Sequence, residues 1–247
     1  GFDDQWKGNL KQRIASYFPF FIKIFFSFAW VSGVYQLEYA KKFGFSNNEI
    51  IYDLYSADLD LYNNLYQDKD SFEKEYPKRF LFVGRFENVK ALDLLLDAWQ
   101  GISDKKKDWE LHLIGNGSLK DTLLDQSSIF INDFMQPDEL IQEIQKMGCF
   151  ILPSRHEPWG VVVHEFAAAG LPLICSDAVG AASSFLISDF NGYIFKSNNS
   201  KSLASKMLKI INSSDKELYK MSKRSHALGQ RITPSTSAMN LLSILES

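Results

Sequence analysis

Cysteine and histidine are scarce in this chain, with two and four residues among 247. So few thiols exclude a disulfide framework of the kind found in small secreted domains. Cys149 and Cys175 each lie inside an apolar run, so we expect small, buried, reduced residues of a cytoplasmic protein. A disulfide or metal pair between them is the less favoured alternative. The first residues show no secretory signal, which fits the same compartment.

An excess of basic residues is also absent. The formal net charge is -3 and the isoelectric point is about 5.9. Proteins that bind nucleic acids normally present a basic face to the phosphates. We therefore expect no nucleic-acid partner.

No apolar run is long enough to cross a membrane. The richest candidate is Tyr17–Val31, which Pro19, Lys23 and Ser27 interrupt and which is shorter than the roughly 20 residues required. We expect a buried helix followed by a buried strand over 26–31. One alternative is an interfacial helix that makes a peripheral contact with the inner face of a membrane. Another is self-association through this Phe-rich segment.

Strand-like and helix-like segments alternate from Phe80 onward. This alternation predicts an α/β fold, a Rossmann-like doubly wound parallel sheet that binds its ligand at the carboxyl ends of the strands. The expected strands lie near 80–84, 109–114, 129–131, 149–152, 172–175 and 192–195.

The chain is expected to contain three parts. Residues 1–60 hold the remnant of an N-terminal domain and a connection, residues 61–232 the Rossmann-like domain, and residues 233–247 a crossing helix. Residues 1–35 are too few for a complete Rossmann-like domain of roughly 100 to 150 residues. The sequence predicts helices over 37–44 and 236–245, two helices over 200–227, and an exposed loop over 68–78.

Two carboxylates stand eight positions apart across a loop-to-helix junction. Glu157 lies in a loop marked by Pro153 and Pro158, and Glu165 lies about 7.5 Å along the following helix. The two carboxylates could therefore reach opposite sides of a bound diphosphate. The helix that carries Glu165 begins near Gly160. The exposed backbone amides of Gly160, Val161 and Val162 would face the anion at the positive end of the helix dipole.

Two cations follow the first strand of the sheet. Arg85 and Lys90 come directly after its carboxyl end. Breaking a sugar-phosphate bond leaves negative charge on a diphosphate, which fixed cations stabilise. Ordinary surface charge is the alternative for both residues.

Five landmarks in this order resemble the retaining glycosyltransferases of the GT-B fold, of the family-four type (glycosyl transferases group 1). They are Gly84-Arg85 with Lys90, Gly115-Asn116-Gly117, Phe130–Phe134, Glu157-Pro158-Trp159-Gly160 with Glu165, and Asn191-Gly192.

The resemblance implies transfer of a sugar from a UDP- or GDP-sugar to a glycan or lipid-linked acceptor, as in cell-surface polysaccharide synthesis. It implies neither a metal nor a cofactor. Glu157 would bind sugar hydroxyls and Glu165 the ribose, while the diphosphate itself takes the acceptor's proton. The implied catalytic residues are Arg85, Lys90 and Glu157, and the implied donor-binding residues are Gly84, Asn116, Asn132, Phe134, Trp159, Gly160, Val161, Val162 and Glu165.

Several positions depart from the family pattern. Ala91 and Asn132 replace glycines, Trp159 replaces phenylalanine and Phe166 replaces alanine. The larger side chains would reshape the donor pocket. We also expect the histidines that precede the two acids, at 156 and 164, to be exposed or satisfied in the core and not catalytic.

Two other functions remain open. The chain could be a nucleotide-binding module without transferase activity, such as half of a split enzyme, because no acceptor-binding residues are visible. It could also be a sugar-nucleotide epimerase of related fold, although that reaction needs further acid and base residues.

Overall fold

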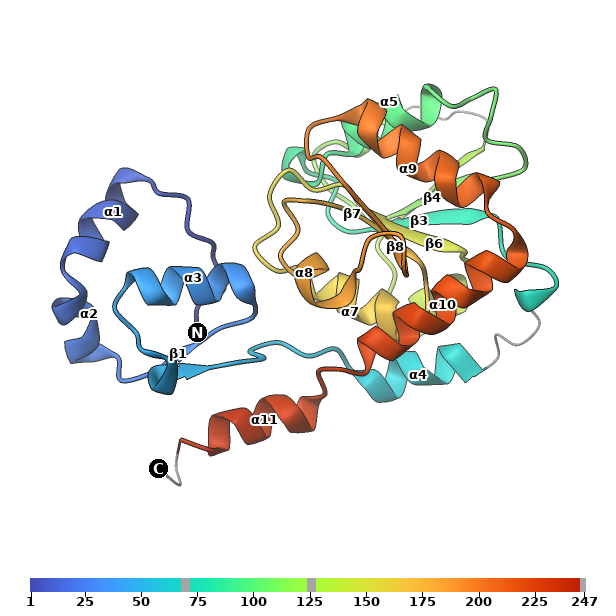
Figure 1. The fold of residues 1–247 in the computed structure, drawn as a ribbon. Coiled ribbons are helices and arrows are strands. Elements are labelled where there is room, and N and C mark those ends of the chain that lie inside the picture. Colours follow the sequence, from blue (N-terminus) through green and yellow to red (C-terminus); the bar gives the residue numbers. More distant parts are fainter. Residues whose placement is uncertain (68–71, 124–127, 245–247) are drawn as a thin grey trace.

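The computed structural model describes residues 1–67, 72–123 and 128–244. Within them the chain forms a small N-terminal unit and a larger α/β unit, joined by an extended segment after residue 51 (Figure 1).

The larger unit is built on a six-stranded parallel sheet, as the sequence predicts. The strand order is β5-β4-β3-β6-β7-β8, and every neighbouring pair runs parallel. The strands are β3 (Arg79–Val83), β4 (Glu110–Ile114), β5 (Ile129–Asn132), β6 (Cys149–Leu152), β7 (Leu173–Ser176) and β8 (Gly192–Phe195).

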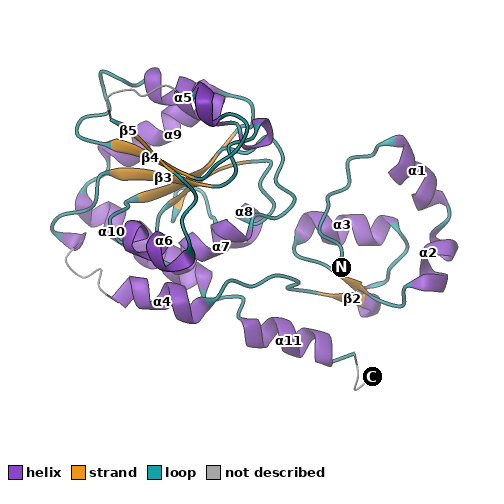
Figure 2. Cartoon of the chain, turned by 180° about the vertical axis from the view of Figure 1, so that it is seen from behind, coloured by secondary structure: helices purple, strands orange, loops and turns teal. Residues whose placement is uncertain are grey.

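Helices cover both faces of this sheet, which confirms the doubly wound fold. Helices α5 (Leu92–Gln100) and α9 (Ser200–Asn212) pack on one face. The other face carries α4 (Leu59–Gln67), α6 (Pro137–Ile144), α7 (Val161–Ala168) and α10 (Asp215–Gly229) (Figure 2). Short helices fill the connections: η3 (Asn88–Lys90), η4 (Lys120–Thr122) and α8 (Ala182–Phe185).

The central strands are apolar along their whole length because both of their faces are buried. Every residue of β6 and β7 is buried, including Cys149 and Cys175, which are free thiols as expected. The core of this unit therefore lies on both sides of the sheet, and polar side chains concentrate beyond the strand ends.

The N-terminal unit is much smaller. It contains α1 (Leu10–Tyr17), α2 (Pro19–Phe25), β1 (Ala29–Trp30), α3 (Val34–Lys42), η1 (Asn47–Glu49) and β2 (Ile50–Ile51). Strands β1 and β2 pair in parallel, and α3 packs over them on a separate small core. Helix α3 begins three residues earlier than the sequence predicts.

The prediction of a buried helix in the Phe-rich segment is wrong, whereas the buried strand is confirmed in part as β1, where Ala29 is 1% and the adjacent Val31 0% exposed. The helix in this segment is α2, and its aromatic side chains face outward: Phe20 is 71% exposed and Phe25 is 78% exposed. Helix α2 is apolar on almost all sides, and a two-stranded sheet can cover only one of them. Membrane contact and self-association of this segment stay predictions.

Among the described residues, no helix combines the length and the apolar character needed to cross a bilayer.

The segment before β3 is not uniformly exposed. Of the predicted loop, residues 68–71 lie outside the described residues. Tyr76 is buried and its hydroxyl donates to the carbonyl oxygen of Gly148 at 3.1 Å. The prediction of an exposed loop is therefore wrong at this tyrosine, which anchors the chain to β6.

The last helix, α11 (Pro234–Leu242), begins two residues before the predicted start, and Leu245 lies outside the described residues. Thr233 caps it by accepting from the backbone N–H of Thr236 at 2.9 Å. Ser237 Oγ donates to the carbonyl oxygen of Asp53 at 2.6 Å. The helix thus lies along the connection between the two units (Figure 1).

Candidate functional site

An apolar hollow of about 360 Å³ opens at the carboxyl ends of β3 and β4. It brings together three residues predicted to bind the donor, Gly84, Asn116 and Phe134, and one predicted to be catalytic, Arg85. Val83, Ile114, Met135 and Leu140 supply the rest of its apolar wall. Apolar walls with a few polar groups at the rim suit a planar aromatic ligand.

Two glycines let the strand ends approach each other beside this hollow. Gly84 N–H donates to the carbonyl oxygen of Ile114 at 3.1 Å, and Gly115 N–H donates to that of Asn132 at 3.1 Å. A Cβ on Gly115 would stand 1.9 Å from the oxygen of Gly84. Asn132 ends β5 and helps to order this edge through its backbone carbonyl. Its φ is not in the left-handed region, so the asparagine replaces glycine without strain.

Lys90 and Glu157 form an ion pair next to this edge. Lys90 Nζ contacts Glu157 Oε2, and Ser154 Oγ donates to the same oxygen at 3.1 Å. The two charged side chains are only 15% and 14% exposed. Lys90 Cε also lies 4.0 Å from where a Cβ on Gly84 would stand, which places the pair beside the hollow.

The backbone near Glu157 and near Lys90 has a defined conformation. Glu157 N–H donates to the carbonyl oxygen of Ala178, and Gly180 N–H donates to that of Glu157 at 2.9 Å. Lys90 ends η3 and is followed by buried Ala91, whose φ of 57° is left-handed. This conformation explains the glycine that is usual here, because a Cβ in the left-handed region costs about 1 kcal/mol.

Helix α7 begins at the site as the sequence predicts. Its N-cap, Gly160, has a φ of 92°, and a Cβ there would stand 2.9 Å from Glu157 Cγ. Val161 and Val162 form the first turn and are half-buried. The start of this helix therefore lies directly beside the Glu157 carboxylate.

Trp159 lies at the boundary between the two units. It is 4% exposed and packs edge-on against Phe185 with ring centroids 6.2 Å apart. A Cβ on Gly33 would stand 2.4 Å from the indole ring. Its large side chain therefore fills the junction with α3 and does not line the apolar hollow.

The N-terminal unit also contacts the Glu157 loop through residues that no sequence motif singles out. Gln36 Nε2 donates to the carbonyl oxygen of Pro158 at 2.7 Å, and Gln5 Nε2 reaches the same oxygen at 3.3 Å. His156 Nε2 lies 3.7 Å from Asp4 Oδ1. A glutamine in an amphipathic helix is an ordinary surface residue in sequence, so only the packing of α3 reveals the fully buried Gln36.

Glu165 lies one and a half turns into α7, where α4 packs against it. It is half-buried and accepts a hydrogen bond from Tyr62 of α4. Burial raises the pKa of the Glu165 carboxyl. Burial, with Glu165 nearby, also raises the pKa of Tyr62. The carboxylate predicted to bind a ribose is thus also a contact to the connecting segment.

His164 is a satisfied core residue, as expected. Its Nδ1 accepts from Ala57 N–H at 3.0 Å, so Nε2 carries the proton and donates to the carbonyl oxygen of Gly229 at 2.8 Å. Burial lowers the pKa of the imidazole. The ring stacks on Phe185 at 4.1 Å. His164 therefore joins the connecting segment to the end of α10 as a neutral group.

Replacing Glu165 with glutamine should stabilise the folded protein near neutral pH. A raised native pKa means that ionised Glu165 opposes folding; this penalty grows as pH rises from the pKa of the unfolded carboxyl to that of the native one and is constant above it. Glutamine keeps an acceptor for Tyr62 without the charge, so we expect a gain of about 1 kcal/mol, typical of desolvating a polar group. The gain should vanish below about pH 4.3, where the unfolded carboxyl is protonated. Urea denaturation at several pH values measures it.

Glu217→Gln is a control of opposite sign. Glu217 caps α10 by accepting from Ser214 N–H, and this hydrogen bond lowers the pKa of the carboxyl. Its replacement should lower stability at neutral pH and have no effect in acid. Equal effects of the two substitutions would contradict the role assigned to burial of Glu165.

No group of three or more His, Cys, Asp or Glu side chains within the described ranges is placed to hold a metal ion. Two Asp-x-Asp runs occur, at 58–60 and 68–70, and the second lies outside the described residues. In the first, Asp58 Oδ1 accepts from Leu61 N–H at 3.3 Å at the start of α4. We therefore assign Asp58 a capping role.

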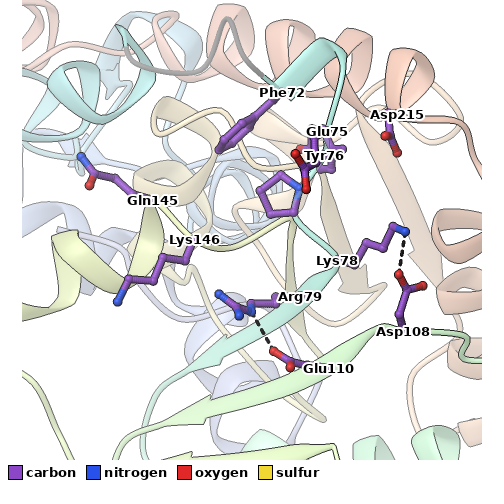
Figure 3. Close-up of a pocket in the computed structure, with 11 residues that line it drawn as sticks. Phe72, Glu75, Tyr76, Lys78, Arg79, Asp108, Glu110, Gln145, Lys146 and Asp215 are labelled. Atoms are coloured by element: carbon purple, nitrogen blue, oxygen red, sulfur yellow. Dashed lines mark hydrogen bonds and ion pairs between the residues drawn. The ribbon is translucent and has the colours of Figure 1, made fainter.

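A second hollow, of about 490 Å³, lies at the opposite ends of the strands (Figure 3). Four of its charged residues form two ion pairs: Lys78 Nζ lies 2.7 Å from Asp108, and Arg79 Nε lies 2.7 Å from Glu110. Lys78 and Arg79 stand at the amino end of β3, whereas Lys90 and Glu157 follow carboxyl ends. This hollow is therefore separate from the candidate site, and we assign it no ligand.

Comparisons with known proteins agree with this geometry. The family model of glycosyl transferases group 1 matches residues 66–227. An uncharacterized glycosyltransferase of Methanocaldococcus jannaschii is 32% identical over 144 aligned residues, and the match covers 55% of this chain and 38% of that protein. The lipopolysaccharide 1,6-galactosyltransferase of Escherichia coli is 30% identical over 128 aligned residues, and the match covers 47% of this chain and 35% of that protein. The chain thus spans well under half the length of these relatives.

Solved structures share the fold at low sequence identity. Anabaena HepE in complex with UDP superposes with a TM-score of 0.78 and 16% identity over 99% of this chain and 70% of HepE. A variant of S. aureus TarM, also with UDP, gives 0.74 and 15% over 99% of this chain and 49% of TarM. These structures are GT-B glycosyltransferases. Because the family model covers about two thirds of its residues, this chain belongs to the glycosyl transferases group 1 and has the GT-B fold.

Proposed function

We propose that this chain is the donor-binding part of a retaining glycosyltransferase that moves a sugar from a UDP- or GDP-sugar to a glycan or lipid-linked acceptor, as in cell-surface polysaccharide synthesis. The observation that carries the proposal is the Lys90–Glu157 ion pair beside an apolar hollow at the carboxyl ends of β3 and β4. UDP is the first nucleotide to test because HepE and TarM were solved with it.

The nucleobase is placed in the apolar hollow. Phe134 and Met135 on one side and Ile114 on another offer flat apolar surface to a planar ring. Asn116 supplies a polar side chain at the rim, and its Oδ1 already accepts from Gly117 N–H at 2.8 Å. The ribose would then lie toward α7, where Glu165 is available to exchange its Tyr62 hydroxyl for a ribose hydroxyl.

The diphosphate is placed between the two cations. Arg85 is exposed at the hollow, and no ion pair holds its guanidinium among the residues described. Lys90 lies on the other side, close to Gly84. Positive charge fixed at this place stabilises the negative charge that develops on the leaving diphosphate. The amides at the start of α7 add donors of the same sign.

Glu157 is assigned to positioning of the sugar. Its carboxylate is held by Ser154 and Lys90, and once Lys90 turns to a phosphate an oxygen becomes available to sugar hydroxyls. The carboxylate of a retaining glycosidase would instead attack the sugar. In the proposed reaction the acceptor enters on the face of the leaving group, and the diphosphate takes its proton. Membership of a glycosyltransferase family does not support the epimerase alternative.

Calorimetric titration with UDP, UMP and GDP in the presence of EDTA tests the proposal. UDP should bind at least about tenfold more tightly than UMP, because a hydrogen bond to a charged group contributes about 1.5 to 3 kcal/mol. Binding should persist in EDTA because Arg85 and Lys90 supply the positive charge. Equal affinities for UDP and UMP, or loss of binding in EDTA, would contradict the proposed diphosphate site.

A further inference from the structure

The loop that carries Glu157 contains a second charged residue, Arg155, which is locked onto α5. Its guanidinium forms a bidentate pair with the Asp93 carboxylate: Nη1 donates to Oδ1 at 2.9 Å and Nη2 donates to Oδ2 at 2.6 Å. Asp93 stands in the first turn of α5, and the Arg155 side chain is 26% exposed. A bidentate arginine–carboxylate pair fixes the orientation of the guanidinium plane as well as its distance from the carboxylate.

Arg155 also forms hydrogen bonds with the turn that ends in Lys90. Its Nη1 donates to the carbonyl oxygen of Asn88 at 2.6 Å, and its backbone N–H donates to that of Val89 at 2.8 Å. The next residue, Lys90, contacts Glu157 from the same loop. Three consecutive residues of η3 are therefore attached to this loop, the first two of them through Arg155.

The turn depends on such contacts. Internally, Lys90 N–H donates to Glu87 and Ala91 N–H donates to Asn88, in a single turn of 3₁₀ helix followed by left-handed Ala91. Such short turns have poor hydrogen-bond geometry. A lysine ammonium, moreover, stands at the end of a flexible four-carbon stem. Contacts from outside the turn must therefore decide where the Lys90 ammonium stands.

We propose that Arg155 is a positioning residue: locked by Asp93, it holds the Asn88–Lys90 turn against the Glu157 loop and so places the Lys90 ammonium. Only the task of Lys90, binding the diphosphate, rests on the proposed function. Arg155 is not assigned to the nucleotide, because its two terminal nitrogens are already used by Asp93 and Asn88.

Amine labelling tests the position of Lys90 without any ligand. The protein is treated briefly with a trace of acetic anhydride, and mass spectrometry gives the labelling rate of each lysine. In Arg155→Met the rate at Lys90 should rise several-fold, whereas Lys196, 75% exposed, should keep its rate. Arg79→Met is the matched control, since it removes an arginine–carboxylate pair from the opposite end of β3 and should leave Lys90 unchanged.

Asp93→Asn repeats the test while Arg155 itself is retained. It should raise the labelling of Lys90 in the same direction, because the guanidinium loses its charged anchor. An unchanged rate at Lys90 in both folded variants would overturn the proposal. Circular dichroism establishes that each variant is folded before labelling.

A double-substitution cycle on UDP affinity separates positioning from direct contact. Arg155→Met alone should weaken UDP binding, but in the Lys90→Met background it should cause almost no further loss. Full additivity would mean that Arg155 touches the nucleotide itself, which would overturn the positioning role. If the unaltered protein binds no nucleoside diphosphate, the proposed function fails, while the labelling result still decides whether Arg155 places Lys90.

Discussion

Replacing Gly115 with alanine is expected to lower the free energy of unfolding by about 3 to 5 kcal/mol, the sum expected for a strained backbone and an overpacked contact. Gly115 has a φ of 151°, and its added Cβ would lie 1.9 Å from the carbonyl oxygen and 3.0 Å from the carbonyl carbon of Gly84. Both atoms belong to the backbone, so no side-chain rotation can relieve the contact. The ends of β3 and β4 would have to separate, which would also open the apolar hollow and abolish nucleotide binding.

Gly101→Ala provides the matched control for this substitution. Gly101 follows α5, has a φ of −63° and would place its Cβ no closer than 3.3 Å to a backbone oxygen. Its replacement should change stability by less than about 1 kcal/mol. Urea denaturation followed by tryptophan fluorescence measures both variants. A similar decrease in the free energy of unfolding at the two positions would show that the close approach of Gly115 to Gly84 does not require glycine.

Replacing Lys90 with methionine should weaken UDP binding by about 2 to 3 kcal/mol, roughly 30- to 150-fold. Methionine keeps much of the apolar stem and removes the ammonium that faces the diphosphate in the proposed complex. The affinity of uridine, which carries no phosphate, should stay the same. Calorimetry at fixed ionic strength is required because salt screens such contacts.

Glu157→Gln is the informative partner of Lys90→Met. In the unliganded protein Glu157 competes with a phosphate for the Lys90 ammonium, because their ion pair must loosen before the diphosphate binds. Removing the carboxylate charge should therefore leave bare-UDP affinity unchanged or make it tighter. Equal losses in the two variants would mean that the pair matters for folding and not for the diphosphate. A change of less than threefold for Lys90→Met would remove Lys90 from the phosphate site.

Much of the larger α/β unit could be predicted from local sequence because each parallel strand is a short apolar run. Cys149–Leu152 and Leu173–Ser176 are buried on both faces, so their identity does not depend on knowing what packs against them. Residues just after such strands must meet at one edge of the sheet. That rule explains why Gly84, Arg85 and Asn116, predicted from separate segments, line one hollow.

Only tertiary packing decided which of the apolar side chains outside the sheet are buried. The helix of the Phe-rich segment was expected to be buried, yet burial depends on the layers available to cover it, and a two-stranded sheet offers too little. Tyr76 was expected to be exposed. It is buried, and its hydroxyl donates a hydrogen bond to the carbonyl oxygen of Gly148, which is 72 positions away in the sequence. Neither outcome is written in the local pattern, which records how apolar a segment is but not what lies over it.

The sequence by itself determined the class of fold, the order of the strands along the chain and the residue types at their carboxyl ends, because these follow from short-range patterns of apolar and polar residues. Tertiary structure decided which charges meet. Lys90 and Glu157 are 67 positions apart, and Arg155 and Asp93 are 62 apart. Glu165 meets Tyr62 only because α4 packs on α7. Such pairings depend on how whole elements pack, since hydrogen bonds and ion pairs act over a few ångströms in space whatever the separation in sequence.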